Sequence, residues 1–452
     1  MSIMIQRAVA RVDALPLLVG SSFLAAVLRG TGFVTRLDAL LTAVQFGTLV
    51  LALILLWLSS RGQRRIGLVH GLAAAFSIVA LLSAIWSPVP ATTLTRAALF
   101  CVILAIAFET ARIRWTDLQR MQRDLRLLFW AVVAVSTAGL ILGLFQFPGM
   151  WGPYNRFEGL NVNATVGAWM ATMLFPIGYS VALTAGGRRR FLLLAGSGIL
   201  VVVVILSGTR GALIALLLSV IVVHSLTRKR WLIGAIVGLI VAAGLAFTFL
   251  APEILSVDAP APAASPIADP IPVPTPSTPE PVAESPDPQP TQTPAVGRQG
   301  EDGTDISSGR FGLWKNGLEF IQQRPIGGWG FGSTSDLPGF TGGQSMSLHN
   351  AYLSTLIETG ILGALFLGAL CVVIFFRRSV LKWPGLLAAG GAVLINGLFE
   401  SSLVNLGSPV TIVSWLVIGA LYAAGRSVAS SEDEIRNNRT SDYIDLATAT
   451  KV

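Results

Sequence analysis

Ionisable residues that could do chemistry lie within or beside long apolar segments of the sequence. They are Arg96, Arg156, Arg210, Arg310, His349, Glu358 and Glu400. An ionisable side chain at membrane depth is costly, so each is a candidate functional residue. Arginine stays charged at any working pH and its planar fork binds phosphate oxygens, while a histidine with a pKa of about 6.5 suits proton removal from a hydroxyl. Such residue types at one membrane face are typical of a site for a lipid-linked diphosphate and an acceptor hydroxyl.

Each of these residues also has a plainer interpretation. Arginines at the ends of apolar segments could reach lipid headgroups, as Arg96, Arg156 and Arg210 would. Arg310 could be the solvated start of a helix, and His349 could be a helix N-terminal residue without a task. For the two glutamates, we favour a role as partners of buried arginines or other polar groups over a catalytic role.

The elements that must position these residues are apolar helices. The chain has 452 residues, 53% of them hydrophobic and 12% charged, whereas soluble domains carry about 25% charged residues. A membrane span needs about 20 mostly apolar residues. The first candidate segment could suggest a signal peptide, but spans follow at once and we interpret it as a retained helix. The prediction is an all-α polytopic membrane protein with about 12 transmembrane helices, at 12–28, 37–59, 66–86, 93–110, 127–147, 163–184, 191–207, 211–227, 231–251, 349–376, 384–403 and 409–425.

The net charge of +8 follows the topology and does not indicate a nucleic-acid partner. Lys and Arg cluster in every second connection between spans, which is typical of cytoplasmic loops. The pattern predicts the cytoplasmic membrane, with both termini in the cytoplasm and the longest connection outside it. The clusters are Arg61, Arg64 and Arg65; Arg112 and Arg114; Arg188, Arg189 and Arg190; Arg228, Lys229 and Arg230; and Arg377, Arg378 and Lys382.

The predicted organisation is a membrane bundle of about nine spans over 1–251, an extracytoplasmic loop over 252–348, a bundle of about three spans over 349–425 and a disordered tail over 426–452. Residues 259–295 are dense in proline and predict a disordered tether. Residues 307–348 predict a folded part that begins with an amphipathic helix. Its apolar face would hold Phe311, Trp314, Leu318 and Ile321, with Ser308 as N-cap and Pro325 as the stop. Cys101 and Cys371 fall inside spans, so we expect no disulfide, and we expect no metal site.

Several of these motifs together resemble the O-antigen ligase and Wzy-type polymerase family. That family has a Ser-Gly-x-Arg-Gly turn, a Gly-Arg pair with a Trp four residues after the Arg, a Pro-hydrophobic-Gly-x-Gly turn, a His-Asn pair opening a span and a Glu-x-Gly. The similarity covers most of 80–375 and includes WSPVPATTLTRA and RFEGLNVNATVGAW. The glycine turn Pro-Ile-Gly-Gly-Trp-Gly and the proline-rich insert depart from the family pattern. The matching positions are Ser207 to Gly211; Gly309, Arg310 and Trp314; Pro325, Gly327, Gly328 and Gly330; His349 and Asn350; and Glu358 and Gly360.

The resemblance implies a fold similar to lipid-donor (GT-C-like) glycosyltransferases and a function in surface polysaccharide biosynthesis. Glycan would pass from a polyprenyl-diphosphate-linked donor to a glycan, lipid or wall acceptor without a metal or other cofactor, among membrane lipids. Arg210 and Arg310 would bind the diphosphate, Arg156 would help to bind the donor, and His349 would act as base. Possible supporting residues are Glu358, Asn350, Trp314 and Glu400.

Other functions stay open on the sequence alone. A ligase, a polymerase and a protein-targeting oligosaccharyltransferase would share these motifs, because the motifs do not encode the acceptor. A transporter or flippase of the lipid-linked glycan is the alternative from another class, although no internal repeat of the kind common in transporters stands out. A structural or sensor protein with a proline-rich stalk is a further alternative.

Overall fold

The computed structural model describes residues 20–21, 24–25, 38–59, 67–147, 150–152, 156–160, 163–227, 234–243, 310–337, 340, 348–404 and 408–426. Within these residues, nine helices are long and apolar enough to cross a membrane. The protein is therefore a multi-pass helical membrane protein. These helices are α3 (Asp38–Ser59), α4 (Leu68–Leu82) with the 3-10 turn η2 (Ser83–Ile85), α5 (Pro90–Ile113), α6 (Leu118–Leu144), α7 (Ala164–Thr184), α8 (Gly187–Leu206), α9 (Arg210–Thr227), α12 (Ala351–Phe375) and Pro409–Arg426.

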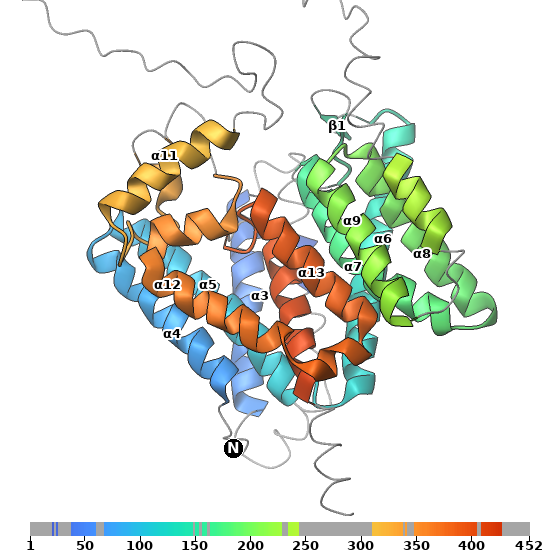
Figure 1. Ribbon diagram of the computed structural model, residues 1–452, viewed down its shortest axis with the longest axis horizontal. Helices are drawn as coiled ribbons and strands as arrows, with labels where there is room; N and C mark the ends of the chain where they lie inside the picture. The colour runs from blue at the N-terminus through green and yellow to red at the C-terminus, as the bar shows by residue number, and fades with distance from the viewer. Residues whose placement is uncertain are drawn as a thin grey trace, which may run out of the picture.

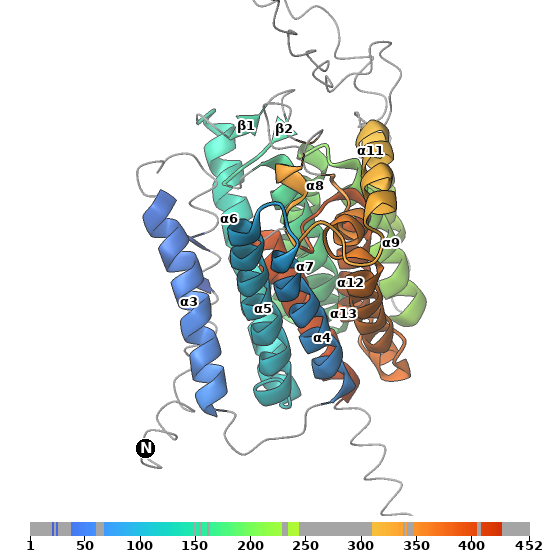
Figure 2. The ribbon, with the colours of Figure 1, turned by 90° about the vertical axis from the view of Figure 1, so that its left-hand side faces the viewer.

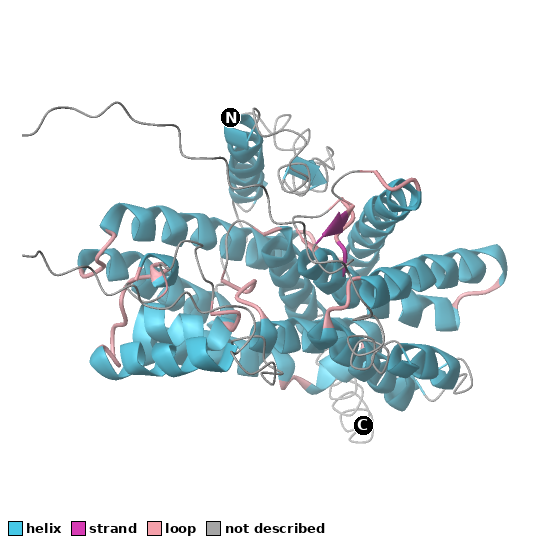
Figure 3. Cartoon of the chain, turned by 90° about the horizontal axis from the view of Figure 1, so that it is seen from above, coloured by secondary structure: helices cyan, strands magenta, loops and turns pink. Residues whose placement is uncertain are grey.

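The remaining described elements are shorter. They are the apolar helices Gly234–Ala243 and α13 (Pro384–Phe399), helix α11 (Arg310–Gln323), the 3-10 turns η4 (Thr334–Asp336) and η5 (Arg378–Lys382), and the strands β1 (Trp151–Gly152) and β2 (Arg156–Phe157). The two strands pair antiparallel, with Trp151 opposite Phe157. Figure 3 shows this pair in magenta among the helices.

Nine of the predicted spans have a counterpart among these nine long helices. Two further predictions are shorter in the described residues than expected: 231–251 is described as Gly234–Ala243, and 384–403 as the 16-residue α13, which ends at Phe399. Of the first predicted span, 12–28, the structure describes only residues 20–21 and 24–25. Ser308, the proline-rich stretch 259–295 and the tail after Arg426 lie outside the described residues.

Several helices begin where the sequence supplies a cap. Asp117 accepts from the backbone N–H of Gln119 and Arg120 at the start of α6, and Asn163 accepts from that of Val166 at the start of α7. Such side chains satisfy backbone donors that have no partner within the helix. Pro90 and Pro384 occupy the first turn of α5 and α13, where the missing N–H of proline costs nothing.

The centre of the bundle is formed by α7 and the helix Pro409–Arg426, whose side chains are almost all buried inside the protein. Helix α7 contacts α6, α8, α9 and α13. Figure 1 shows α13 between the group of α6 to α9 and the group of α4, α5 and α12. The helices at the edge, such as α3, keep large apolar side chains exposed, as expected for surfaces that face lipid.

Helix α12 is broken at Gly360, where the glycine-rich turn after α11 packs against it. Gly360 has φ 63° and ψ −168°, a conformation that is essentially restricted to glycine. The N–H groups of Trp329 and Gly330 donate to the carbonyls of Ile357 and Glu358, each at 2.8 Å. A Cβ on Gly360 would collide with the Ile326 carbonyl. The turn thus donates hydrogen bonds to carbonyl groups of α12 near the break.

One aromatic side chain anchors the same turn in the bundle. Phe331 is fully buried and packs edge-on against Phe76 of α4 and, tilted, against Phe100 of α5. Its N–H donates to the Ser83 hydroxyl at 2.9 Å. The chain after α11 is therefore fixed to the first half of the bundle and to α12.

Helix α11 lies at one end of the bundle, the same end as β1 and β2 (Figure 2). It begins at Arg310 and ends before Pro325, as predicted. The predicted buried face is only partly right: Trp314 and Ile321 pack on the protein, but Phe311 is 65% exposed and Leu318 is 50% exposed. The buried positions are Leu313 and Gly317, because α12 approaches so closely at Gly317 that a Cβ there would lie 3.1 Å from Ile357.

Candidate active site

The side chains of Arg310, His349 and Glu400, which come from distant parts of the sequence, meet at this end of the bundle. Glu400 Oε1 lies 3.2 Å from Arg310 Nη2, and Glu400 Oε2 lies 2.9 Å from His349 Nδ1. The Glu400 side chain is 16% exposed, whereas those of Arg310 and His349 are 29% and 41% exposed. The carboxylate is thus enclosed, while its two partners remain open to a ligand.

Glu400 takes this position because helix α13 ends at the residue before it. The sequence placed it inside the eleventh span, but α13 ends at Phe399 and Glu400 is in an extended conformation (φ −147°, ψ 152°). Its backbone N–H still donates to the Asn396 carbonyl at 2.7 Å. The carboxylate therefore projects beyond the helix end, where it can be paired instead of buried in the bundle.

His349 is fixed by the residues on either side of it. Its φ of 49° is uncommon for a residue with a side chain. Asn350 caps α12 by accepting from the N–H groups of Tyr352 and Leu353, each at 3.0 Å. Trp314 Nε1 donates to the Leu348 carbonyl at 2.9 Å. Trp314 and Asn350 therefore hold the backbone that carries His349.

A second cluster surrounds the turn between α8 and α9. Arg156 Nε donates to the Ser207 carbonyl at 2.8 Å, and its Nη2 lies 3.2 Å from Thr209 Oγ1. Gly208 in this turn has φ 63°. Arg210 is the first residue of α9, not the end of the preceding span, and it is half-buried. Burial raises the pKa of the nearby Glu158 carboxyl, and the charge of Arg156 acts in the opposite direction.

The two clusters lie at the same end of the bundle. Helices α9 and α13 pack against one another, and a Cβ on Gly211 would lie 2.9 Å from the ring of Phe399. Gly211 follows Arg210, and Phe399 precedes Glu400, so the first turn of α9 rests against the residue next to the carboxylate. The absence of a side chain at Gly211 permits this approach.

Glu358 does not join either cluster. It is 5% exposed, and its Oε1 accepts from the Thr334 hydroxyl at 2.8 Å. Its backbone carbonyl accepts from Gly330 in the glycine-rich turn. Arg96, for which headgroup contact was one interpretation, instead donates to the Gly332 carbonyl and lies 3.1 Å from Asp336 Oδ2. Both residues thus bind the segment after α11.

Thr209, Thr334 and Asp336 are polar partners that the sequence analysis did not single out. Thr209 lies within the Ser-Gly-x-Arg-Gly turn, so its place beside Arg210 was a usable signal. Thr334 and Asp336 carried no such signal, because their partners lie on other helices. Within the described part of the chain, no group of three or more His, Cys, Asp or Glu side chains could hold a metal ion.

These features define a class: a multi-pass helical membrane protein with an Arg–Glu–His cluster and further arginines at one end of the bundle. In a comparison with protein families, residues 195–368 match the model of the O-antigen ligase family. This match confirms the resemblance noted from the motifs. No curated protein matches the chain.

The matched region contains both the turn before α9 and the segment from α11 into α12. It therefore includes Arg210, Arg310 and His349, whereas Arg156 and Glu400 lie outside it. The family implies a role in joining or polymerising lipid-linked glycans during surface polysaccharide synthesis.

Proposed function

We propose that the protein transfers or polymerises glycan from a polyprenyl-diphosphate-linked donor to an acceptor hydroxyl at the outer face of the cytoplasmic membrane, without a metal ion. The observation that carries this proposal is the contact of one carboxylate, Glu400, with both Arg310 and His349. This contact supports the proposal because a guanidinium, which can bind phosphate, and an imidazole, which can accept a proton, share one carboxylate.

The arginines form the donor side of the site. Arg310 uses one side of its guanidinium for Glu400 and, with five N–H donors in all, has others to offer to a diphosphate oxygen. Arg210 and Arg156 contribute positive charge from the α8–α9 turn and its neighbouring strand. Fixed positive charge that faces the bridging oxygen favours departure of the diphosphate, so a general acid is not required.

His349 forms the acceptor side. Its Nδ1 faces the Glu400 carboxylate, which can only accept a hydrogen bond when ionised, so this nitrogen carries the proton. The other ring nitrogen, Nε2, is then unprotonated and carries the lone pair that a base needs. Glu400 holds the ring in this tautomer and stabilises the positive charge that the ring acquires, and is therefore a positioning residue.

The chemical step is a single displacement. The acceptor oxygen bonds to the anomeric carbon while the bond from that carbon to the diphosphate oxygen breaks. The hydroxyl proton moves to Nε2 of His349, and the bonding electron pair leaves with the diphosphate. Such a displacement inverts the configuration at the anomeric carbon.

The placement of basic residues supports an outward-facing site. Arg112 ends α5, Arg188 to Arg190 begin α8, and Arg377 follows α12. Each of these helices has its other end at the side of Arg310 and His349. Since Lys and Arg concentrate on the cytoplasmic side, we propose that the site, and with it the loop 252–348, faces outward and that both termini are cytoplasmic.

The test is transfer by purified protein in vitro with a polyprenyl-diphosphate-linked donor. His349→Ala should reduce the transfer rate by about 10²–10⁴-fold, the usual contribution of a general base. His224→Gln is the matched control, because His224 is hydrogen-bonded to Tyr179 toward the opposite end of α9. This variant should keep most of the activity. Near-normal transfer by His349→Ala would overturn the assignment of the base.

The carrier-linked glycans that accumulate in cells lacking the protein would distinguish a polymerase from a ligase. Accumulation of single repeat units on the polyprenyl carrier would indicate a polymerase, because extension is then the missing step. Accumulation of long carrier-linked polymer would indicate a ligase, because only the final transfer is then missing.

A further inference from the structure

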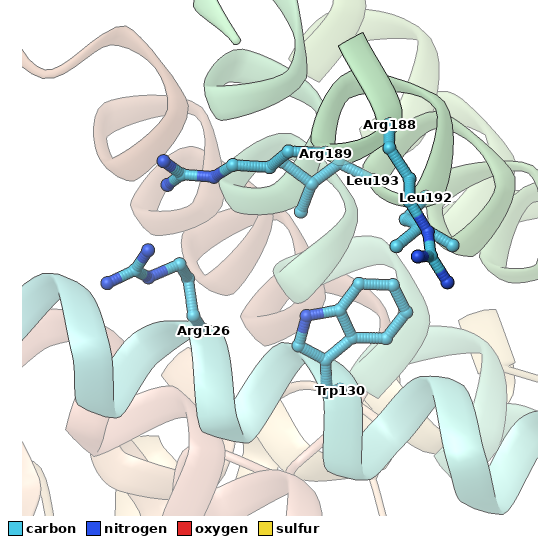
Figure 4. A pocket seen from close by; sticks show the side chains of 6 residues that line it. All are labelled: Arg126, Trp130, Arg188, Arg189, Leu192 and Leu193. Carbon is cyan, nitrogen blue, oxygen red and sulfur yellow. The ribbon is translucent and has the colours of Figure 1, made fainter. Parts of the chain in front are cut away.

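A cavity of about 330 Å³ lies between α6 and α8, toward the ends of these helices that are far from Glu400. It is lined by Arg126, Trp130, Arg188, Arg189, Leu192 and Leu193. Figure 4 shows the guanidinium groups of Arg126 and Arg189 on one side of the cavity, with Arg188 on the other side and the Trp130 indole beneath. Helix α8 lies at the edge of the bundle (Figure 1).

The lining carries three positive charges and no carboxylate. The nearest acidic residues along α6 are engaged elsewhere: Asp117 pairs with Arg120, and Asp124 pairs with Arg114 and accepts from Trp115. Arg126 donates to the Gln122 carbonyl of its own helix, a contact that leaves its charge uncompensated. Like charges around one cavity repel, and an anion seated among them removes that repulsion.

The rest of the lining is apolar, and part of it is exposed at the edge of the bundle. Trp130 is 38% exposed and Leu192 is 43% exposed, while Leu193 is buried. Tryptophan is enriched at the membrane–water interface, where its ring packs on apolar groups and its N–H stays near water. The cavity therefore presents positive charge and apolar surface side by side at headgroup depth.

We propose that this cavity binds the headgroup of an acidic phospholipid, which is a site separate from the transfer reaction. The lipid phosphate would lie among Arg126, Arg188 and Arg189, and the first part of the acyl chains would lie on Trp130 and Leu192. A soluble anion would satisfy the arginines but would leave the apolar half uncovered. The combination of both halves at the edge of the bundle is what favours a lipid.

The test measures lipid retention by the purified full-length protein. Detergent-solubilised protein is mixed with equal amounts of phosphatidylglycerol and phosphatidylcholine, and the bound lipids are counted by native mass spectrometry. The triple variant Arg126→Gln, Arg188→Gln, Arg189→Gln should bind phosphatidylglycerol at least about tenfold more weakly than wild type, since each arginine near an anionic headgroup adds to the attraction. The matched control Arg120→Gln, Arg378→Gln, Lys382→Gln removes the same charge from the same end of the protein and should bind as wild type does.

Three results would overturn the proposal. The first is an equal loss of phosphatidylglycerol binding in the triple variant and in the control. The second is equal retention of phosphatidylcholine and phosphatidylglycerol by the wild type. The third is displacement of the lipid by millimolar inorganic phosphate, which would indicate a site for a soluble anion. If the triple variant does not fold, the single variants Arg126→Gln and Arg189→Gln carry the same test with an expected weakening of about threefold each.

Discussion

Two glutamates on the C-terminal side of the chain lie in regions that use a carboxylate in opposite ways. Glu400 lies beyond the end of α13 between two partly exposed side chains, the guanidinium of Arg310 and the imidazole of His349. Glu358 lies inside α12, two residues before the break at Gly360, and is bound to the hydroxyl of Thr334. Both stand inside segments that the sequence predicts as spans, 349–376 and 384–403, so residue type and hydropathy do not separate them.

The difference lies in the partners. A carboxylate held between an arginine and a histidine can affect the orientation and charge of both groups during a reaction. A carboxylate bound to a hydroxyl and flanked by a backbone turn instead holds two segments of the chain together. We therefore assign Glu400 to the chemistry and Glu358 to the architecture that supports it. The following substitutions separate these two roles.

The largest effect is expected in the Glu358 region, from Gly360→Ala. An alanine there would be forced into a conformation reserved for glycine and would collide with the Ile326 carbonyl. We expect a loss of about 2–6 kcal/mol of stability, measured as a fall in the thermal unfolding midpoint of the purified protein. Gly368→Ala is the control, because a Cβ at this position of the same helix meets no atom within 4 Å. Equal midpoints for the two variants would contradict the role of the break.

In the Glu400 region, Glu400→Gln should slow transfer by about 10–100-fold while the protein remains folded. The amide keeps the shape of the side chain but loses the charge that holds Arg310 and His349, and hydrogen bonds to charged groups contribute about 1.5–3 kcal/mol. The measurement is kcat for transfer together with its pH profile. A purely structural role would lower stability and leave the pH profile as in wild type, and that outcome would refute the positioning role.

A smaller effect is expected from Trp314→Phe, which removes the hydrogen bond to the Leu348 carbonyl beside His349. One such bond contributes about 0.5–1.5 kcal/mol, so we expect transfer to slow by up to about tenfold. Trp329→Phe is the matched control: its Nε1 donates to the Phe320 carbonyl at 3.0 Å, on the side of the glycine-rich turn. It should cost similar stability but little activity. Equal losses of activity in Trp314→Phe and Trp329→Phe would contradict the distinction between the two regions.

The smallest effect is expected from Glu358→Gln. Glutamine keeps an oxygen that can accept from Thr334, so stability should change by less than about 1.5 kcal/mol and transfer should stay within about threefold of wild type. A loss of transfer as large as that of Glu400→Gln, measured side by side, would show that Glu358 takes part in the chemistry.

Much of the fold was predictable because apolar periodicity and span length are local properties. Most long helices begin and end within a few residues of the predicted limits, although α6 begins at Leu118 and the prediction started that span at residue 127. The amphipathic face of α11 was partly wrong, because which residues are buried depends on where α12 approaches. At Gly317 a Cβ would lie 3.1 Å from the Ile357 side chain, and a hydropathy pattern does not encode such a close approach.

The candidate site was predictable only in part, for a related reason. Arg310 and His349 stand out as charged residues at the ends of apolar runs, whereas the place of Glu400 depends on where α13 stops. Two serines follow Glu400, but the apolar residues Leu403 and Val404 come next, so the prediction extended the span past the point where α13 ends. The pairing of residues 90 positions apart is a property of the packed bundle.

The most direct test of the central claim is a structure of the protein with a polyprenyl diphosphate bound. Our account predicts that diphosphate oxygens lie within hydrogen-bonding distance of the Arg310 and Arg210 guanidinium groups, with the anomeric side facing Nε2 of His349. A diphosphate bound away from Arg156, Arg210 and Arg310, or turned so that His349 cannot reach an acceptor, would contradict it.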